Sequence, residues 1–166
     1  MKKVLKILAL VLTLAMVFSL AACGNQDNAT SGSNSESAGI AKDKLKIGVI
    51  HIGDPADGSG YSYAHDQGIV GMQKNLGLSD DQIVRKLNVS DSDNSAIKEA
   101  IESCVAEGCN LIFGTSYGYM DTMEEMAAEH PEVYFSHGTG YLSNDTNFNN
   151  YFGRIYQARY LAGVAA

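Results

Sequence analysis

Short apolar runs alternate with longer amphipathic segments from Leu45 to the last residue of the chain, and this alternation restricts the fold more than any other feature. Apolar, β-prone runs predict strands at 45–52, 82–89, 111–113, 133–136 and 150–152. Helical spacing of apolar residues predicts helices at 62–76, 95–107, 119–129 and from Arg154 onward. Strands that alternate with helices of this length form βαβ units, so we expect an α/β fold with a doubly wound parallel sheet.

Three lysines precede an uncharged, apolar segment at 7–20, and the sequence Leu-Ala-Ala-Cys follows at 20–23. This combination is typical of a signal peptide, here 1–22. The sequence Leu-Ala-Ala-Cys at 20–23 resembles a bacterial lipobox, which implies cleavage before Cys23 and acylation of its thiol. An uncleaved anchor is the alternative, but the apolar core is short for a membrane-spanning helix. We therefore expect a protein on the extracytoplasmic face of the cell membrane, anchored by a lipid.

The segment 24–41 consists mainly of Asn, Ser, Gly and Ala, which bury too little apolar surface to offset the entropy of ordering. We expect the lipidated cysteine and a flexible linker at 23–43, followed by one domain at 44–166. The chain stops at Ala166 within a predicted apolar helix that has no cap and no charged last turn. We therefore expect 44–166 to be the N-terminal lobe of a longer protein, truncated at its C-terminus.

Acidic side chains outnumber basic ones, with 19 Asp and Glu against 12 Lys and Arg and a net charge of −7. Three of the lysines lie in the predicted leader, so the remaining domain is more acidic still. An acidic surface disfavours nucleic acid and polyphosphates as partners, and it favours a neutral or cationic small molecule. Acidity that serves solubility alone is an equally good interpretation.

Beyond Cys23 the chain has two cysteines, Cys104 and Cys109. Export from the cytoplasm permits a disulfide between them, and packed structural thiols are the other interpretation. Neither cysteine has the C-x-x-C spacing of a metal site. We expect no metal and no cofactor.

Three loops with aromatic and polar residues follow predicted strands, at 54–63, 115–119 and 137–141. The carboxyl ends of parallel strands lie at one edge of a sheet, where open α/β sheets bind ligands. Aromatic rings there can stack on a planar ligand, and neighbouring hydroxyls and carboxylates can bind its polar edge. Candidate acceptors for a pair of sugar hydroxyls are Asp54, Asp57 and Asp66. The first loop lacks the G-x-G-x-x-G pattern of dinucleotide-binding proteins.

The sequence Gly-Thr-Ser-Tyr-Gly at 114–118 matches the G-x-S-x-G pattern of a nucleophile elbow, between a predicted strand and a predicted helix. Ser116 would be the nucleophile of an extracytoplasmic hydrolase and His137 its base, but no acid between them stands out to orient the histidine. A tight turn that lines a ligand cleft is the simpler interpretation. A metal site formed by His65, Asp66 and His137 has no further support. We expect no enzymatic activity.

Together with the lipobox, three segments resemble the basic membrane protein (BMP) family, the substrate-binding lipoproteins of ABC transporters that are related to purine nucleoside receptors. These segments are 57–68, 113–121 and 153–163, and the resemblance extends over 44–166. It implies the first lobe of a type I periplasmic-binding-protein fold, with a nucleoside or nucleobase bound between two lobes. It also implies ABC permease subunits as partners.

The resemblance further implies that Tyr61 stacks on the ligand and that Asp57 contacts its polar atoms. The remaining candidate ligand-binding residues are Tyr63, Ser116, Tyr117, Gly138 and Thr139. We therefore expect a lipid-anchored solute-binding protein that delivers a purine nucleoside or nucleobase to an ABC importer. A lipoprotein that senses such a ligand for a membrane signalling receptor is the alternative, which the sequence does not separate from transport.

Overall fold

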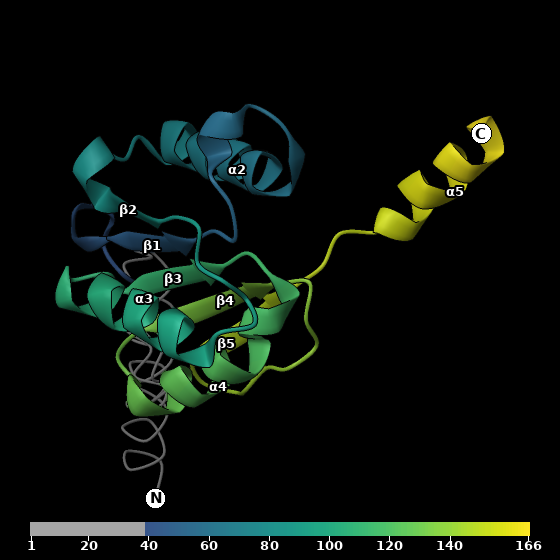
Figure 1. The fold of residues 1–166 in the computed structure, drawn as a ribbon. Helices are drawn as coiled ribbons and strands as arrows, with labels where there is room; N and C mark the ends of the chain where they lie inside the picture. Colours follow the sequence, from purple (N-terminus) through teal and green to yellow (C-terminus); the bar gives the residue numbers. More distant parts are fainter. Residues whose placement is uncertain (1–38) are drawn as a thin grey trace, which may run out of the picture. The chain divides into compact units, whose positions relative to one another are not determined.

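Five short strands form one parallel sheet at the centre of residues 39–166, the part of the chain that this computed structural model describes (Figure 1). They are β1 (Ile47–Ile50), β2 (Ile83–Lys86), β3 (Leu111–Gly114), β4 (Tyr134–Gly138) and β5 (Phe148–Tyr151). Every neighbouring pair is parallel, in the order β2-β1-β3-β4-β5. The predicted α/β fold is therefore confirmed. The predicted leader, Cys23 and the linker as far as residue 38 lie outside the described residues.

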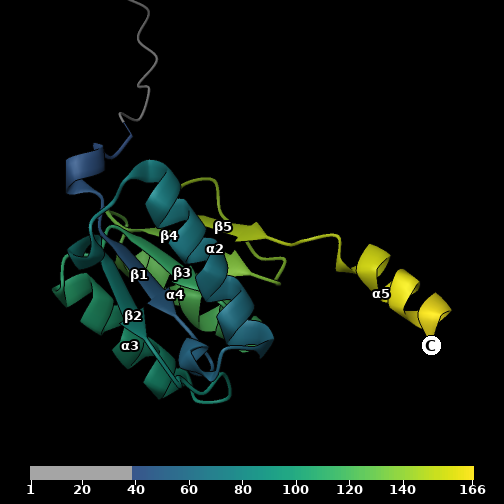
Figure 2. The same ribbon diagram turned by 90° about the horizontal axis from the view of Figure 1, so that it is seen from above.

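Helices lie on both faces of the sheet, as a doubly wound fold requires. α2 (Gly60–Leu76) lies on one face, whereas α3 (Asn94–Ala106) and α4 (Met120–Glu129) lie on the other (Figures 1 and 2). Two apolar cores correspond to these two faces. The larger core joins α3 and α4 to the sheet, and the smaller core joins α2 to β1 and β2.

Short 3-10 helices connect several of these elements. They are η1 (Lys42–Lys44), η2 (Pro55–Asp57), η3 (Asp80–Gln82) and η4 (Tyr117–Tyr119). One further helix, α5 (Ile155–Ala165), follows β5, and all of its residues are exposed (Figure 2). Within residues 39–166, no helix combines the length and the apolar character needed to cross a membrane.

The structure corrects two of the predicted strand boundaries. β4 continues to Gly138, so His137 and Gly138 are buried strand residues rather than loop residues. β5 begins at Phe148 rather than at residue 150, because hydrogen bonds from the preceding Asn147 position the start of the strand beside β4. The Asn147 side-chain amide donates a hydrogen bond of 2.8 Å to the carbonyl of Val133, just before β4. The other predicted elements agree with the structure to within about three residues at each end.

Cys104 and Cys109 are buried, free thiols at the end of α3. Gly108 has a positive φ of 86°, and the Cys109 N–H donates a hydrogen bond of 2.9 Å to the Cys104 carbonyl. This is the hydrogen bond of a Schellman motif, in which apolar side chains at these two positions commonly contact each other. The structure therefore agrees with packed structural thiols.

Candidate ligand-binding site

The strand order reverses between β1 and β3, and such a switch point is where open α/β sheets bind ligands. His51 follows β1 at this edge of the sheet, and Thr115 follows β3. Both are buried, with 3.2 Å between His51 Nδ1 and Thr115 Oγ1. Because these side chains are buried, the groups that face a ligand must come from the neighbouring loops and helices.

The first turns of α2 bring two aromatic side chains to this edge. Gly60 has a φ of 83°, which lets the chain turn from η2 into the helix. Ser62 secures the turn, because its Oγ accepts a hydrogen bond of 3.0 Å from the backbone N–H of Gly53. Tyr61 remains 45% exposed, and its ring lies 4.4 Å from that of His65, one helical turn later.

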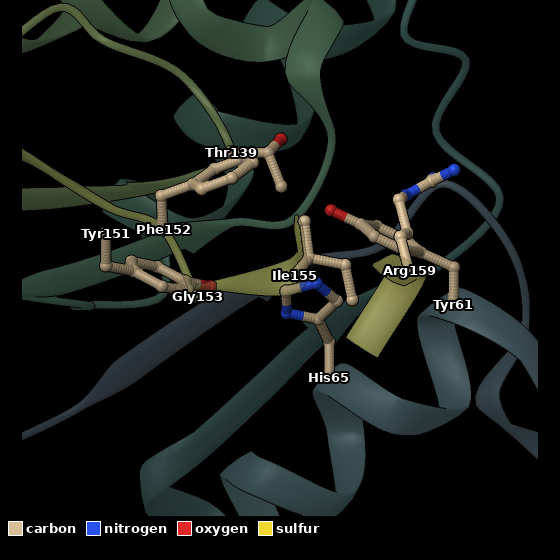
Figure 3. A pocket seen from close by; sticks show the side chains of 8 residues that line it. All are labelled: Tyr61, His65, Thr139, Tyr151, Phe152, Gly153, Ile155 and Arg159. Carbon is tan, nitrogen blue, oxygen red and sulfur yellow. The ribbon is translucent and has the colours of Figure 1, made fainter. Parts of the chain in front are cut away.

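A cavity of about 410 Å³ opens beside Tyr61 and His65 (Figure 3). Its other walls come from the residues after β4, the end of β5 and the start of α5. The lining residues are Tyr61, His65, Thr139, Tyr151, Phe152, Gly153, Ile155 and Arg159. The phenol groups of Tyr61 and Tyr151 both point toward the space between these walls (Figure 3). The volume lies within the range of small-molecule sites, about 300–1,000 Å³.

Two titratable side chains of this cavity are neutral near pH 7. Burial lowers the pKa of His65, and the neighbouring His51 lowers it further. Burial also raises the pKa of Tyr151 to about 12. Arg159 is the lining residue that carries a full positive charge. The cavity therefore offers aromatic faces and neutral polar groups, which suit a planar ligand with polar edge atoms.

Thr139 adopts a backbone conformation that β-branched residues rarely adopt, with a φ of 77°. Its N–H donates a hydrogen bond of 3.0 Å to the carbonyl of Tyr151. The preceding Gly138 packs closely against Tyr151, because a Cβ there would lie 3.0 Å from the Tyr151 hydroxyl, which would have to shift. Backbone strain of this kind occurs preferentially at binding and active sites. The β4–β5 pairing thus holds a strained residue at the cavity wall.

Ser116 and His137 do not form a nucleophile–base pair. Ser116 Oγ donates a hydrogen bond of 2.7 Å to Asp91 Oδ2, whereas His137 Nε2 donates one of 2.7 Å to the backbone carbonyl of Ser116. His137 Nδ1 accepts a hydrogen bond of 3.1 Å from Asn150 Nδ2, so both ring nitrogens are occupied. The sequence at 114–118 is therefore a tight turn, and His137 is not free to bind a metal ion.

Three other sequence-predicted residues do not line the cavity. Asp57 is exposed at the end of η2, and Tyr117 is 57% exposed at the start of η4. Tyr63 is half-buried on α2. None of these three lines the cavity, whereas Tyr61 and Thr139 line it together.

Sequence reasoning missed most of the wall formed by β5 and α5. The missed side chains are Tyr151, Phe152, Ile155 and Arg159, and His65 was considered only as a possible metal ligand. Tyr151 and Phe152 lie within the fifth predicted strand, at 150–152, and Ile155 and Arg159 lie within the predicted helix that follows it. The rule that selects the loops after strands therefore does not select any of them.

Residues 44–166 match a protein family described as ABC transporter substrate-binding protein, PnrA-like. A purine-binding protein of Brucella abortus is 37% identical over 129 residues, which cover 78% of this chain and 35% of the relative. A Haloferax volcanii protein named as an ABC transporter glucose-binding protein is 32% identical over 139 residues, covering 84% of this chain and 33% of the relative. The chain thus spans about a third of the length of these curated relatives.

Solved structures of solute-binding proteins have a similar fold. The ABC transporter solute-binding protein of Conexibacter woesei has a TM-score of 0.54 and 21% identity, covering 72% of this chain and 38% of that protein. A solute-binding protein of Aeropyrum pernix has a TM-score of 0.57 and 15% identity, covering 72% of this chain and 31% of that protein. At these identities the likeness concerns the fold alone.

Proposed function

This chain belongs to the PnrA-like family of ABC transporter substrate-binding proteins, and we propose that it forms one lobe of an extracytoplasmic protein that binds a purine nucleoside or nucleobase for an ABC importer. The family has a binding role rather than an enzymatic one. We place the second lobe in the part of a longer protein that this chain does not include, since the curated relatives are much longer. Closure of two lobes over the ligand would complete the site.

The cavity beside α2 is the observation on which this proposal rests. Tyr61 and Tyr151 offer aromatic faces, and stacking on such faces is effective for every base. The imidazole of His65 and the two phenol groups can donate or accept hydrogen bonds at the edge of a purine. The acidic balance of the chain disfavours a phosphorylated ligand. A neutral nucleoside or base fits these properties better than a nucleotide does.

The two named relatives suggest different ligands for comparison. The B. abortus relative is named for purine binding, and the H. volcanii relative for glucose binding. Aromatic rings also pack against sugars, so glucose is a reasonable second probe. The aromatic side chains of Tyr61, Tyr151 and Phe152 on the cavity walls favour the purine.

Thermal unfolding of the full-length protein with separate probes tests the ligand class. The probes are adenosine, guanosine, adenine, guanine and glucose. A ligand present at one hundred times its Kd stabilises the folded state by about 2.7 kcal/mol, which gives a clear rise in Tm. We expect at least one purine probe to produce this rise. If glucose alone stabilises the protein, or if no probe does, the purine proposal is wrong.

We also propose that Cys23 carries a lipid anchor, because a short apolar leader ends directly before it. Replacing Cys23 with Ser should move the protein from the membrane fraction to the soluble fraction. Replacing Ser33 with Ala, in the polar segment that follows Cys23, is the control. It should leave the distribution of the protein between the membrane and soluble fractions unchanged. A Cys23→Ser variant that stays in the membrane fraction would contradict lipid anchoring.

Permease subunits are the partners that this function requires. Deleting the cognate permease should abolish uptake of the bound purine by intact cells. If uptake is unchanged while purine-dependent gene expression is lost on deleting this protein, the sensing alternative replaces transport.

A further inference from the structure

Three titratable or charged side chains meet between α2 and the sheet, beside the proposed binding cavity. Asp66 is on the inner face of α2, Arg85 is on β2, and His51 follows β1. Arg85 Nε donates a hydrogen bond of 2.7 Å to Asp66 Oδ1. His51 Nε2 lies 3.4 Å from the same carboxylate oxygen, and His51 is completely buried. The proposed function gives these three side chains no direct contact with the ligand.

His51 is unusual because one of its ring nitrogens has no hydrogen-bond partner. The Thr115 hydroxyl donates its proton to the Ile50 carbonyl at 2.9 Å, so it accepts a hydrogen bond from His51 Nδ1 at 3.2 Å. A neutral His51 then presents an unprotonated Nε2 to the Asp66 carboxylate. Within residues 39–166, this Nε2 is the buried side-chain nitrogen or oxygen that lacks a hydrogen bond. Such an atom calls for an explanation, because leaving it unpaired is costly.

Asp66 is connected to the cavity through the geometry of α2. Neighbouring residues on a helix point in different directions, so Asp66 faces the sheet while His65 faces the cavity. Tyr61 lies one turn before His65, and the two rings pack against each other at an interplanar angle of 58°. The contact between Asp66 and Arg85, together with the packing of Ile69 in the apolar core, therefore restrains the rotation of α2 about its axis. That rotation decides where Tyr61 and His65 stand in the cavity wall.

We propose that Asp66 is a positioning residue for ligand binding, and that His51 makes this positioning sensitive to pH. The proposal rests on the proposed function of the cavity. The groups that face His51 are Asp66 and His65 on α2 and Arg85 on β2. When α2 is packed against the sheet, a proton on Nε2 faces the Asp66 carboxylate, but it adds a second positive charge to a largely buried group of side chains that already contains Arg85. Because His51 is completely buried, the cost of burying this charge exceeds the attraction to Asp66, and protonation of His51 opposes close packing of α2.

The direction of the pH effect follows from this opposition. Burial lowers the pKa of His51, the Asp66 carboxylate partly offsets this effect, and the Arg85 charge adds to it. The packed arrangement thus binds a proton less readily than an arrangement in which α2 has moved away. Acidification should loosen α2, and a looser α2 should bind the ligand less tightly.

Ligand affinity in the full-length protein tests the positioning role. The probe is whichever of adenosine, guanosine, adenine or guanine stabilises the unmodified protein, and Kd is measured by titration calorimetry. Asp66→Asn should weaken binding by about ten-fold, within the range seen for residues that act through others. Glu124→Gln removes an exposed carboxylate on α4 and should leave Kd unchanged. If Asp66→Asn folds and binds as tightly as the unmodified protein, the positioning role is wrong.

Amide hydrogen exchange in α2 tests the pH effect without any ligand. After correction for the intrinsic rates, α2 of the unmodified full-length protein should be less protected at about pH 5.5 than at about pH 7.5. In His51→Gln, the loss of α2 protection on acidification should be smaller than in the unmodified protein, because only His65 and His137 then contribute to it. Equal protection at both values in the unmodified protein would overturn the proposal. An unchanged loss in His51→Gln would also overturn the proposal. Because this measurement needs no ligand, it remains decisive if no purine binds and the proposed function fails.

Discussion

Tyr61 is the residue on which the proposed binding of a purine depends most. Its ring is half exposed at the cavity and is backed by His65, so a base can stack on its free face. Removing an aromatic side chain that stacks on a base costs about 1–3 kcal/mol. Tyr61→Ala in the full-length protein should therefore raise the Kd for a purine probe by about 5- to 150-fold.

The Tyr61→Phe variant separates stacking from hydrogen bonding at this position. It keeps the ring and removes the hydroxyl, so its Kd should stay close to that of the unmodified protein if stacking dominates. Titration calorimetry on both variants provides the comparison. If Tyr61→Phe binds as weakly as Tyr61→Ala, the hydroxyl rather than the ring carries the interaction.

The sequence predicted where the binding site lies better than it predicted which side chains form it. The rule that loops after parallel strands gather at one edge located Tyr61 and Thr139, which share one cavity. It also selected Asp57 and Tyr117, which are exposed outside that cavity. Whether a residue after a strand enters the cavity depends on how far that strand extends and where the following loop turns. Tyr151 enters the cavity because β5 pairs with β4 in one register, and no local pattern encodes that register.

At the scale of elements, the contact between β1 and α3 depends on a glycine. A Cβ on Gly48 would lie 2.8 Å from Cys104 Sγ and 3.3 Å from Ile112 Cγ1. Overpacking of this kind costs about 1–3 kcal/mol, so Gly48→Ala should lower the urea midpoint of unfolding. Adding Cys104→Ala removes the sulfur and should restore part of the loss.

A second glycine provides the control for this experiment. Gly71 lies within α2, and a Cβ there would have no heavy atom within 4 Å. Gly71→Ala should therefore raise the urea midpoint, because Ala is favoured over Gly in a helix by about 1 kcal/mol. Equal effects of the two Gly→Ala changes, or no recovery in Gly48→Ala/Cys104→Ala, would show that packing against Cys104 is not the cause.

The sequence predicted which segments form strands and which form helices, because for most of these segments the pattern of apolar residues matches the side that is buried in the fold. The strands β1 and β3 are apolar runs, buried throughout in β1 and buried or half-buried in β3, and α3 and α4 have apolar residues at helical spacing. β5 is the exception, because its sequence Phe-Asn-Asn-Tyr has little apolar character. Its start is fixed by long-range hydrogen bonds from Asn147, including one of 2.8 Å to the Ala127 carbonyl on α4. A bond of this kind is invisible to any local reading of the sequence.

At the scale of the whole molecule, two buried histidines, His51 and His137, and the half-buried His65 make stability depend on pH. Burial is the main cause that lowers the pKa values of His51, His65 and His137 from 6.5. The unfolded chain therefore binds more protons than the folded chain below pH 6.5, and folding becomes less favourable there. The folded state has its full free energy of unfolding above pH 6.5, where these histidines are neutral in both states. It loses part of this free energy as the pH falls from 6.5 through the lowered pKa values.

Urea unfolding at about pH 7.5 and about pH 5.5 measures this effect, since most carboxylates stay ionised in that range. The midpoint should be lower at the more acidic value. The His137→Gln variant, which removes one of the three groups, should reduce the difference. An unchanged or higher midpoint at the acidic value would mean that these histidines are not buried neutral in the folded state.

The cavity also predicts how residues 39–166 should behave without the second lobe that we propose. Small-molecule sites bury about 70–90% of the ligand surface, and we propose that the second lobe supplies part of the surface that encloses the ligand. If the two lobes contribute equally, loss of one halves the binding free energy. A Kd of about 1 μM in the full-length protein would then become about 1 mM in residues 39–166 alone.

Titration calorimetry on the two proteins tests this expectation, and circular dichroism checks that residues 39–166 keep the helices α2, α3 and α4 when expressed alone. Tyr61→Ala in both proteins gives a further comparison. It should weaken binding by the full-length protein strongly and have little measurable effect on the short form, whose affinity is already low. Equal affinity of the short and full-length proteins would show that this lobe holds a complete site, and that the second lobe contributes few contacts to the ligand.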